Sequence, residues 1–204
     1  MKLAIFDFDE TLIKENSLSY LFKNILDSKY LLPKLLSIFF KLSTFTNVYN
    51  FGIKYTIKRH LYLSCLNGVS EKQLFESGEI VSGKLTPLSK VLDKLIELDK
   101  KGVRIWIITA TPTPFVKGVI NQLSWPVSEV IGTELYKHNG VFTGEFGEEC
   151  IKDEKVKVIK QAIELKGISP LITDAYGNLP VDIPMLMLAS NAYSVNNGNI
   201  YTFK

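Results

Sequence analysis

Cysteine, histidine and net charge are all scarce in this sequence of 204 residues. Its two cysteines, Cys65 and Cys150, are far apart and belong to no CxxC pair, which excludes a disulfide scaffold and predicts a reduced, intracellular protein. Its two histidines, His60 and His138, lack the spacing of a zinc site. A net charge of +3 is too small to predict a nucleic acid as partner.

Long apolar runs are also missing, because none approaches the roughly 20 residues that a membrane-spanning helix needs. The stretch from Tyr30 to Phe45 is rich in Leu, Ile and Phe, but Pro33, Lys34 and Lys41 interrupt it. We predict a cytoplasmic protein in which this stretch is a helix of a bundle. Peripheral membrane contact is the alternative, since lysines beside large apolar side chains suit a helix on a membrane surface.

Apolar residues, in contrast, make up 46% of the chain, which is enough to bury a sizeable core in one domain with a modest insertion. Basic charge is concentrated between Ile13 and Ser64, a segment that carries +6 while the remainder carries −3. This segment is either a solvated helical surface or a face that meets an anionic substrate or membrane.

Apolar spacing divides the chain into a helical segment and an alternating one. Residues 17–82 are predicted to be helical, with a capping box at Ser70 and Gln73. Strands and helices then alternate, which predicts an α/β fold with a doubly wound parallel sheet. The core would comprise residues 1–14 and 86–204, and residues 15–85 would form an inserted all-helical cap. The predicted strands are 3–6, 103–108, 130–131, 171–173 and 192–195, with a hairpin at 134–146 and helices from Thr86-Pro87, at 113–123, 153–165 and 182–188.

Two carboxylates, Asp7 and Asp9, follow the first predicted strand. Side chains on an extended backbone repeat every second residue, so both leave the strand on the same side. Like charges this close repel, so either one carboxyl holds a proton or a divalent cation lies between them. Magnesium fits, because it prefers oxygen ligands and often uses one or two carboxylates with a substrate phosphate. The alternative is a pair that only caps the loop.

Further polar residues follow other predicted strands, and ligands of such sheets bind where strands end. Thr109 follows the strand 103–108, and Lys155 lies in the first turn of the helix 153–165. Asp174, Asn178 and Asp182 follow the strand 171–173. Carboxylates, a hydroxyl and a cation together suit a metal ion and a phosphate.

These residues occur in an order that resembles the haloacid dehalogenase (HAD) phosphatases. DFDETL, from Asp7, resembles their first motif, DxDx[TV]; Ile107-Ile108-Thr109 resembles the second, and Lys155 (with Lys152 as a weaker competitor) the third. The segment from Gly177 to Asp182 resembles the fourth, GDxxxD, except that Asn178 replaces its first aspartate. The resemblance covers nearly the whole chain. The inserted cap is similar to that of the phosphoserine-phosphatase-like branch, and the layout to the phosphatidylglycerophosphatase C type.

The resemblance implies a magnesium-dependent phosphatase that forms an aspartyl-phosphate. Asp7 would be the nucleophile and Asp9 the general acid and base. Thr109 and Lys155 would bind the phosphoryl group. Mg²⁺ would lie between Asp7, the Asp9 backbone carbonyl, and Asn178 or Asp182, with Asp174 as the other candidate for the missing carboxylate.

The substrate is less well defined, and either a small metabolite phosphate or a phospholipid head-group phosphate is expected. Phosphoserine phosphatases carry a recognising Glu nine residues after the nucleophile, where this chain has Asn16, preceded by Glu15. These two residues and Arg59 are tentative substrate contacts from the cap. A phosphotransferase or phosphomutase, or an inactive binding module, is the alternative function.

Overall fold

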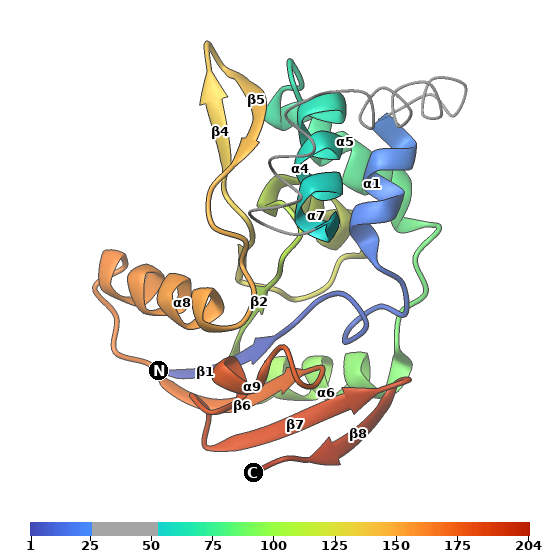
Figure 1. The fold of residues 1–204 in the computed structure, drawn as a ribbon. Helices are drawn as coiled ribbons and strands as arrows, with labels where there is room; N and C mark the ends of the chain where they lie inside the picture. Colours follow the sequence, from blue (N-terminus) through green and yellow to red (C-terminus); the bar gives the residue numbers. More distant parts are fainter. Residues whose placement is uncertain (26–52) are drawn as a thin grey trace.

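A computed structural model describes residues 1–25 and 53–204 of the chain. A six-stranded sheet lies at the centre of these residues (Figure 1). Its strand order is β3-β2-β1-β6-β7-β8, and neighbouring strands are parallel except β7 and β8. After β1 the chain adds β2 and β3 on one side of β1, and later adds β6, β7 and β8 on its other side. The carboxyl end of β1 is therefore at the point where the strand order reverses, which is where ligands bind in such folds. The strands are β1 (Lys2–Phe6), β2 (Arg104–Ile108), β3 (Glu129–Ile131), β6 (Leu171–Gly177), β7 (Asn191–Asn196) and β8 (Asn199–Thr202).

Helices cover both faces of this sheet. They are α6 (Ser89–Lys100), α7 (Thr113–Leu123), α8 (Asp153–Leu165) and α9 (Ile183–Leu186). Leu3 and Ile5 of β1 pack in a hydrophobic cluster with side chains of α8 and α9. The alternate residues Ala4 and Phe6 pack with side chains of α6 and α7 on the other face. The predicted doubly wound α/β fold is therefore confirmed.

Further helices and a hairpin of the described residues lie beyond one end of the sheet, at the top of Figure 1. They are α1 (Ser17–Ile25), α4 (Ile53–Cys65), α5 (Glu71–Ser82), β4 (Leu135–His138) and β5 (Val141–Phe146). The predicted capping box begins α5, where the Ser70 hydroxyl accepts a hydrogen bond from the Gln73 N–H at 3.2 Å. Asn139 and Gly140 both adopt positive φ in the hairpin turn, as a two-residue turn between twisted strands requires.

The predicted cap and core share one hydrophobic cluster in the described ranges. Leu21, Tyr62 and Leu74 of the former pack in the same cluster as Phe6 and Phe115 of the latter. The domain boundaries stay a prediction, and the apolar segment from residue 30 to residue 45 lies outside the described residues. Of the helices described, none is long and apolar enough to cross a membrane.

Two glycines allow α5 and α7 to cross in direct backbone contact. A Cβ on Gly78 would lie 2.0 Å from the Phe115 carbonyl oxygen, and a Cβ on Gly118 would lie 2.0 Å from the Phe75 carbonyl oxygen. Only hydrogen fits at these positions. Because α5 belongs to the predicted cap and α7 to the core, this crossing holds the two together.

We expect Gly118→Ala to lower the free energy of unfolding by about 2–3 kcal/mol, because the added methyl group must push the two helices apart. Urea unfolding followed by circular dichroism measures the effect. Gly83→Ala is the matched control, since its Cβ would meet nothing within 4 Å and its φ of −68° suits alanine. Equal stability of Gly118→Ala and the unmodified protein would contradict the close crossing.

The predicted helix start at Thr86 and Pro87 is wrong, because α6 begins at Ser89. The Thr86 N–H and hydroxyl donate to the Glu15 carboxylate at 2.8 and 2.7 Å, and Pro87 pairs with Ile13 in an isolated bridge. These contacts between distant parts of the chain hold both residues outside the helix.

The C-terminal part also differs from its prediction. β6 continues to Gly177 instead of ending at Thr173, so Asp174 lies within the strand, where it accepts a long hydrogen bond from Asn191 at 3.5 Å. The helix predicted at 182–188 is limited to α9. The prediction omits β8, which pairs with β7 at the edge of the sheet.

Candidate active site

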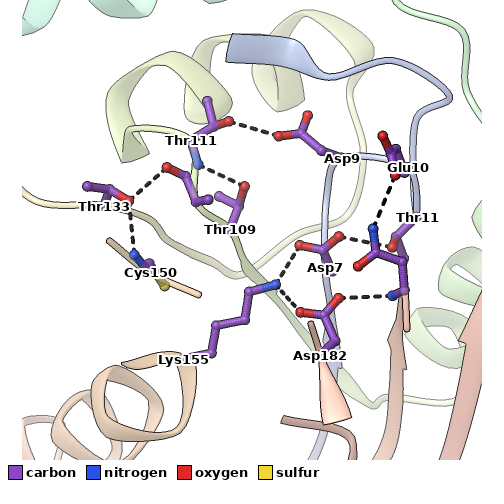
Figure 2. Close-up of polar contacts among 12 residues, drawn as sticks. Asp7, Asp9, Glu10, Thr11, Thr109, Thr111, Thr133, Cys150, Lys155 and Asp182 are labelled. Carbon is purple, nitrogen blue, oxygen red and sulfur yellow. Dashed lines mark hydrogen bonds and ion pairs between the residues drawn. The ribbon is translucent and has the colours of Figure 1, made fainter. Parts of the chain in front are cut away.

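A lysine between two aspartates forms the centre of the site, at the carboxyl ends of β1 and β6 (Figure 2). Asp7 directly follows β1, and its N–H donates to the Tyr176 carbonyl of β6 at 2.9 Å. Lys155 extends from the first turn of α8, and its Nζ lies 2.6 Å from Asp7 Oδ1 and 2.6 Å from Asp182 Oδ1. Asp7, Lys155 and Asp182, hereafter the Asp–Lys cluster, are only 6%, 2% and 1% exposed.

Burial and the charges within the Asp–Lys cluster shift the pKa values of Lys155 and Asp182. Burial on its own lowers the pKa of Lys155, but the charges of Asp7 and Asp182 more than offset this and hold the pKa above its ordinary value. Burial, with repulsion from Asp7, raises the pKa of Asp182. Lys155 therefore stays a cation across the physiological pH range, and it compensates for one of the two neighbouring carboxylates.

Asp9 is held in a separate hydrogen-bonded position. Its Oδ1 accepts from the Ser17 N–H at 2.7 Å. Its Oδ2 accepts from the Thr111 hydroxyl at 2.9 Å, as Figure 2 shows. Burial raises the pKa of Asp9 to about 6, with repulsion from Asp7 adding to the shift and these hydrogen bonds opposing it. A carboxyl with this pKa can hold a proton and lose it near neutral pH.

Threonine hydroxyl groups form hydrogen bonds in the loop that follows β2 and next to it. Thr109 is fully buried, and its Oγ1 accepts from the Thr111 N–H at 3.1 Å. Thr133 joins this loop to the segment before α8, because its hydroxyl donates to the Ala110 carbonyl at 2.7 Å and accepts from the Cys150 N–H at 3.1 Å. These bonds fix the loop that positions Thr109.

Glu10 and Asn178 meet beside the Asp–Lys cluster. Asn178 Nδ2 donates a long hydrogen bond to Glu10 Oε2 at 3.4 Å, and the Asn178 N–H donates to Asp182 Oδ2 at 2.9 Å. Glu10 has a φ of +58°, a left-handed conformation that costs a residue with a Cβ about 1–2 kcal/mol. Both residues line a groove of about 870 Å³ that also includes Lys14 and Tyr201.

Three predicted substrate contacts bond to partners outside the Asp–Lys cluster. Glu15 binds Thr86, as described above. Asn16 is exposed, with its backbone carbonyl accepting from the Ser19 hydroxyl at 2.7 Å. Arg59 of α4 lies 3.9 Å from a carboxylate oxygen of Glu145 in the hairpin. None of these contacts leads to Asp7, and a substrate role for these residues stays a prediction.

Other residues of the site have no role in the sequence prediction. Thr11 donates its hydroxyl hydrogen to Asp7 Oδ2 at 3.0 Å, and Thr111 and Ser17 hold Asp9. Thr11 and Thr111 are each two residues from a predicted site residue, which is a usable signal. Ser17 has no such signal, because its role depends on how the loop after β1 turns.

Oxygen donors of the site fit a magnesium ion better than a metal with many side-chain ligands. In the described part of the chain, no group of three or more His, Cys, Asp or Glu side chains is arranged to hold a metal ion. Magnesium, however, keeps several of its waters and is usually bound by one or two carboxylates. The Asp7 carboxylate and the Asn178 amide oxygen match that requirement.

A parallel sheet with buried carboxylates, hydroxyls and a lysine at its carboxyl edge defines an α/β protein of the Rossmann-like class. A family model described as haloacid dehalogenase-like hydrolase matches residues 4–187. The chain therefore belongs to the haloacid dehalogenase-like hydrolase family.

The individual proteins that this chain is similar to share little sequence identity with it. The chain is similar to a phosphoserine phosphatase of Halobacterium salinarum, with 27% identity over 104 residues, and the match spans 51% of this chain and about half (49%) of that protein. A protein of unknown function from Bordetella pertussis Tohama I has a similar structure, with a TM-score of 0.70, 18% identity, and coverage of 91% of this chain and 86% of that one. A substrate-bound phosphoserine phosphatase has a TM-score of 0.56, 17% identity, and coverage of 92% and 82%. These structural similarities show the fold alone.

Proposed function

We propose that this protein is a magnesium-dependent phosphatase that hydrolyses phosphomonoesters through an aspartyl-phosphate on Asp7. The observation that carries the proposal is the buried Asp–Lys cluster at the end of β1, next to an aspartate whose pKa is raised to about 6. Lys155 supplies a permanent positive charge where a phosphoryl group would lie. The family to which the chain belongs is a family of hydrolases, in agreement with this chemistry.

The first step is attack by a carboxylate oxygen of Asp7 on phosphorus. The new oxygen–phosphorus bond forms as the bond to the leaving oxygen breaks, and protonated Asp9 gives its proton to that oxygen. Thr109 donates a hydrogen bond to a phosphoryl oxygen, and Lys155 offsets the charge that develops there. The Thr11 hydroxyl, 3.0 Å from Asp7 Oδ2, keeps the nucleophile oriented.

The second step is hydrolysis of the aspartyl-phosphate. Asp9, now ionised, accepts a proton from a water molecule while the water oxygen forms a bond to phosphorus. The bond between phosphorus and the Asp7 oxygen breaks, which releases inorganic phosphate and restores the carboxylate. Asp9 is then protonated again and ready for the next cycle.

Three groups would hold the magnesium ion: the Asp7 carboxylate, the backbone carbonyl of Asp9 and the amide oxygen of Asn178. Asp182 is the other candidate: its oxygens accept hydrogen bonds from Lys155 and from the Asn178 N–H, just as the oxygens of Asp7 accept from Lys155 and Thr11. When bound, the ion supplies charge stabilisation to the phosphoryl group in the transition state.

A small-molecule phosphomonoester is the substrate class that we propose. The Halobacterium relative is named for phosphoserine, a small molecule. Phosphoserine itself is not favoured here, because Asn16 replaces the expected glutamate and the neighbouring Glu15 is bonded to Thr86. A lipid substrate and contact with a membrane through residues 30–45 stay predictions, since that segment is outside the described residues.

Removing magnesium tests the reaction class. We expect EDTA to lower turnover of p-nitrophenyl phosphate at least about 100-fold, because a bound metal contributes several kcal/mol of transition-state stabilisation. Added Mg²⁺ should restore the rate. Ca²⁺ serves as the control cation, since it takes more ligands at longer distances and should bind without restoring turnover. A rate that EDTA leaves unchanged would refute the magnesium dependence.

A further inference from the structure

A cation beside Asn178 would have few negative charges close to it. Of the two carboxylates in the Asp–Lys cluster, one is compensated by Lys155, whose Nζ lies 2.6 Å from each. Asn178 itself is neutral, although its backbone bonds to that cluster. Asp9 is engaged by Ser17 and Thr111. A carboxylate that is not part of these interactions would therefore change the affinity of this edge of the sheet for a divalent cation.

Glu10 is such a carboxylate. It accepts a hydrogen bond from Asn178 Nδ2 at 3.4 Å, and an amide whose nitrogen faces Glu10 presents its oxygen to another partner. The two residues also line one groove, so a hydrated ion can approach them from solvent. Holding a ligand by its second polar atom is a common way in which proteins orient metal ligands and strengthen binding.

The backbone of Glu10 supports a functional reason for this residue. Glycine adopts a φ of +58° without steric cost, whereas glutamate adopts it only at a steric cost. Backbone strain of this kind is found mainly at functional sites. The position therefore favours glycine for stability, whereas the contact with Asn178 requires the carboxylate.

We propose that Glu10 is a positioning residue for the divalent cation: it orients the Asn178 amide oxygen toward the ion and supplies a negative charge that Asn178 lacks. This inference rests on the proposed magnesium-dependent function and adds a residue to its site. Glu10 acts through Asn178 and has no part in the two chemical steps.

Calorimetric titration of MgCl₂ into the chelator-treated protein tests the proposal without any turnover. We expect Glu10→Gln to weaken Mg²⁺ binding about 10-fold or more, as loss of an outer-shell partner does at other metal sites. Glu10→Gly should weaken binding similarly and also raise the melting temperature in EDTA, because it removes the strained φ. The matched control is Glu164→Gln, an exposed glutamate of α8, which should leave the affinity unchanged.

A compensating substitution makes the charge argument specific. In the double variant Glu10→Gln with Asn178→Asp, the carboxylate returns at position 178, so Mg²⁺ affinity should recover to at least that of the unmodified protein. Affinity of Glu10→Gln within twofold of the unmodified protein, no recovery in the double variant, or no Mg²⁺ binding by the unmodified protein would each overturn the inference. Weaker binding by Glu10→Gln in a protein that turns over no phosphomonoester would instead support the inference and refute the phosphatase.

Discussion

Asp7→Asn is expected to lower turnover of p-nitrophenyl phosphate by about 10⁴-fold or more, because an amide cannot attack phosphorus to form the aspartyl-phosphate. The substitution is nearly isosteric, and the amide oxygen can still accept from Thr11 or pair with Lys155, which retains Asp182 at 2.6 Å. The fold should therefore persist while the reaction stops. Steady-state rates with Mg²⁺ present, together with circular dichroism of both proteins, separate loss of activity from loss of structure.

Asp93→Asn is the matched control for this experiment, because it makes the same chemical change on the exposed surface of α6. It should keep full activity. Acid quenching during turnover, followed by mass spectrometry, should find covalent phosphate on the peptide that contains Asp7 in the unmodified protein and on no peptide of Asp7→Asn. Full turnover by Asp7→Asn would show that Asp7 is not the nucleophile.

The core of the fold could be predicted because its signals are local. Apolar runs with alternating helices identify the parallel strands, and the boundaries predicted for α7 and α8 agree with the structure. Strand ends of a parallel sheet meet at one edge, so polar residues that follow strands collect there. Lys155 indeed lies within hydrogen-bonding distance of both Asp7 and Asp182, although the catalytic roles of these residues stay predictions.

The remaining features depend on contacts between distant parts of the chain. Thr86 looks like a helix cap in sequence, yet Glu15 binds both its N–H and its hydroxyl. β8 is the exception, because Asn197 and Gly198, both with positive φ, form a two-residue hairpin turn between β7 and β8 whose signal is local and which the prediction overlooked. The contact of Glu10 with Asn178 joins residues 168 positions apart. Propensity and motif spacing contain no information about such pairs.

Lys155→Met is expected to lower the free energy of unfolding by about 3–5 kcal/mol at pH 8, because removing one partner of a buried ion pair leaves uncompensated charge. Methionine keeps much of the volume and the apolar stem of the side chain, but Asp7 and Asp182 would then face each other without the cation that lies 2.6 Å from both. Loss of that charge at the phosphoryl site should also lower turnover about 10²- to 10³-fold.

The pH dependence of this loss identifies its cause. Without Lys155, burial and repulsion between Asp7 and Asp182 raise a carboxyl pKa in the folded variant above its unfolded value of about 3.9. The folded variant then binds the extra proton below that raised pKa and loses this stabilisation as pH rises through it. Urea unfolding in EDTA should therefore show a smaller deficit at pH 5 than at pH 8. Lys160→Met, an exposed substitution on the same helix, should change stability by less than about 0.5 kcal/mol at either pH. A deficit that is equal at pH 5 and pH 8 would attribute the effect to packing of the lysine stem and not to its charge.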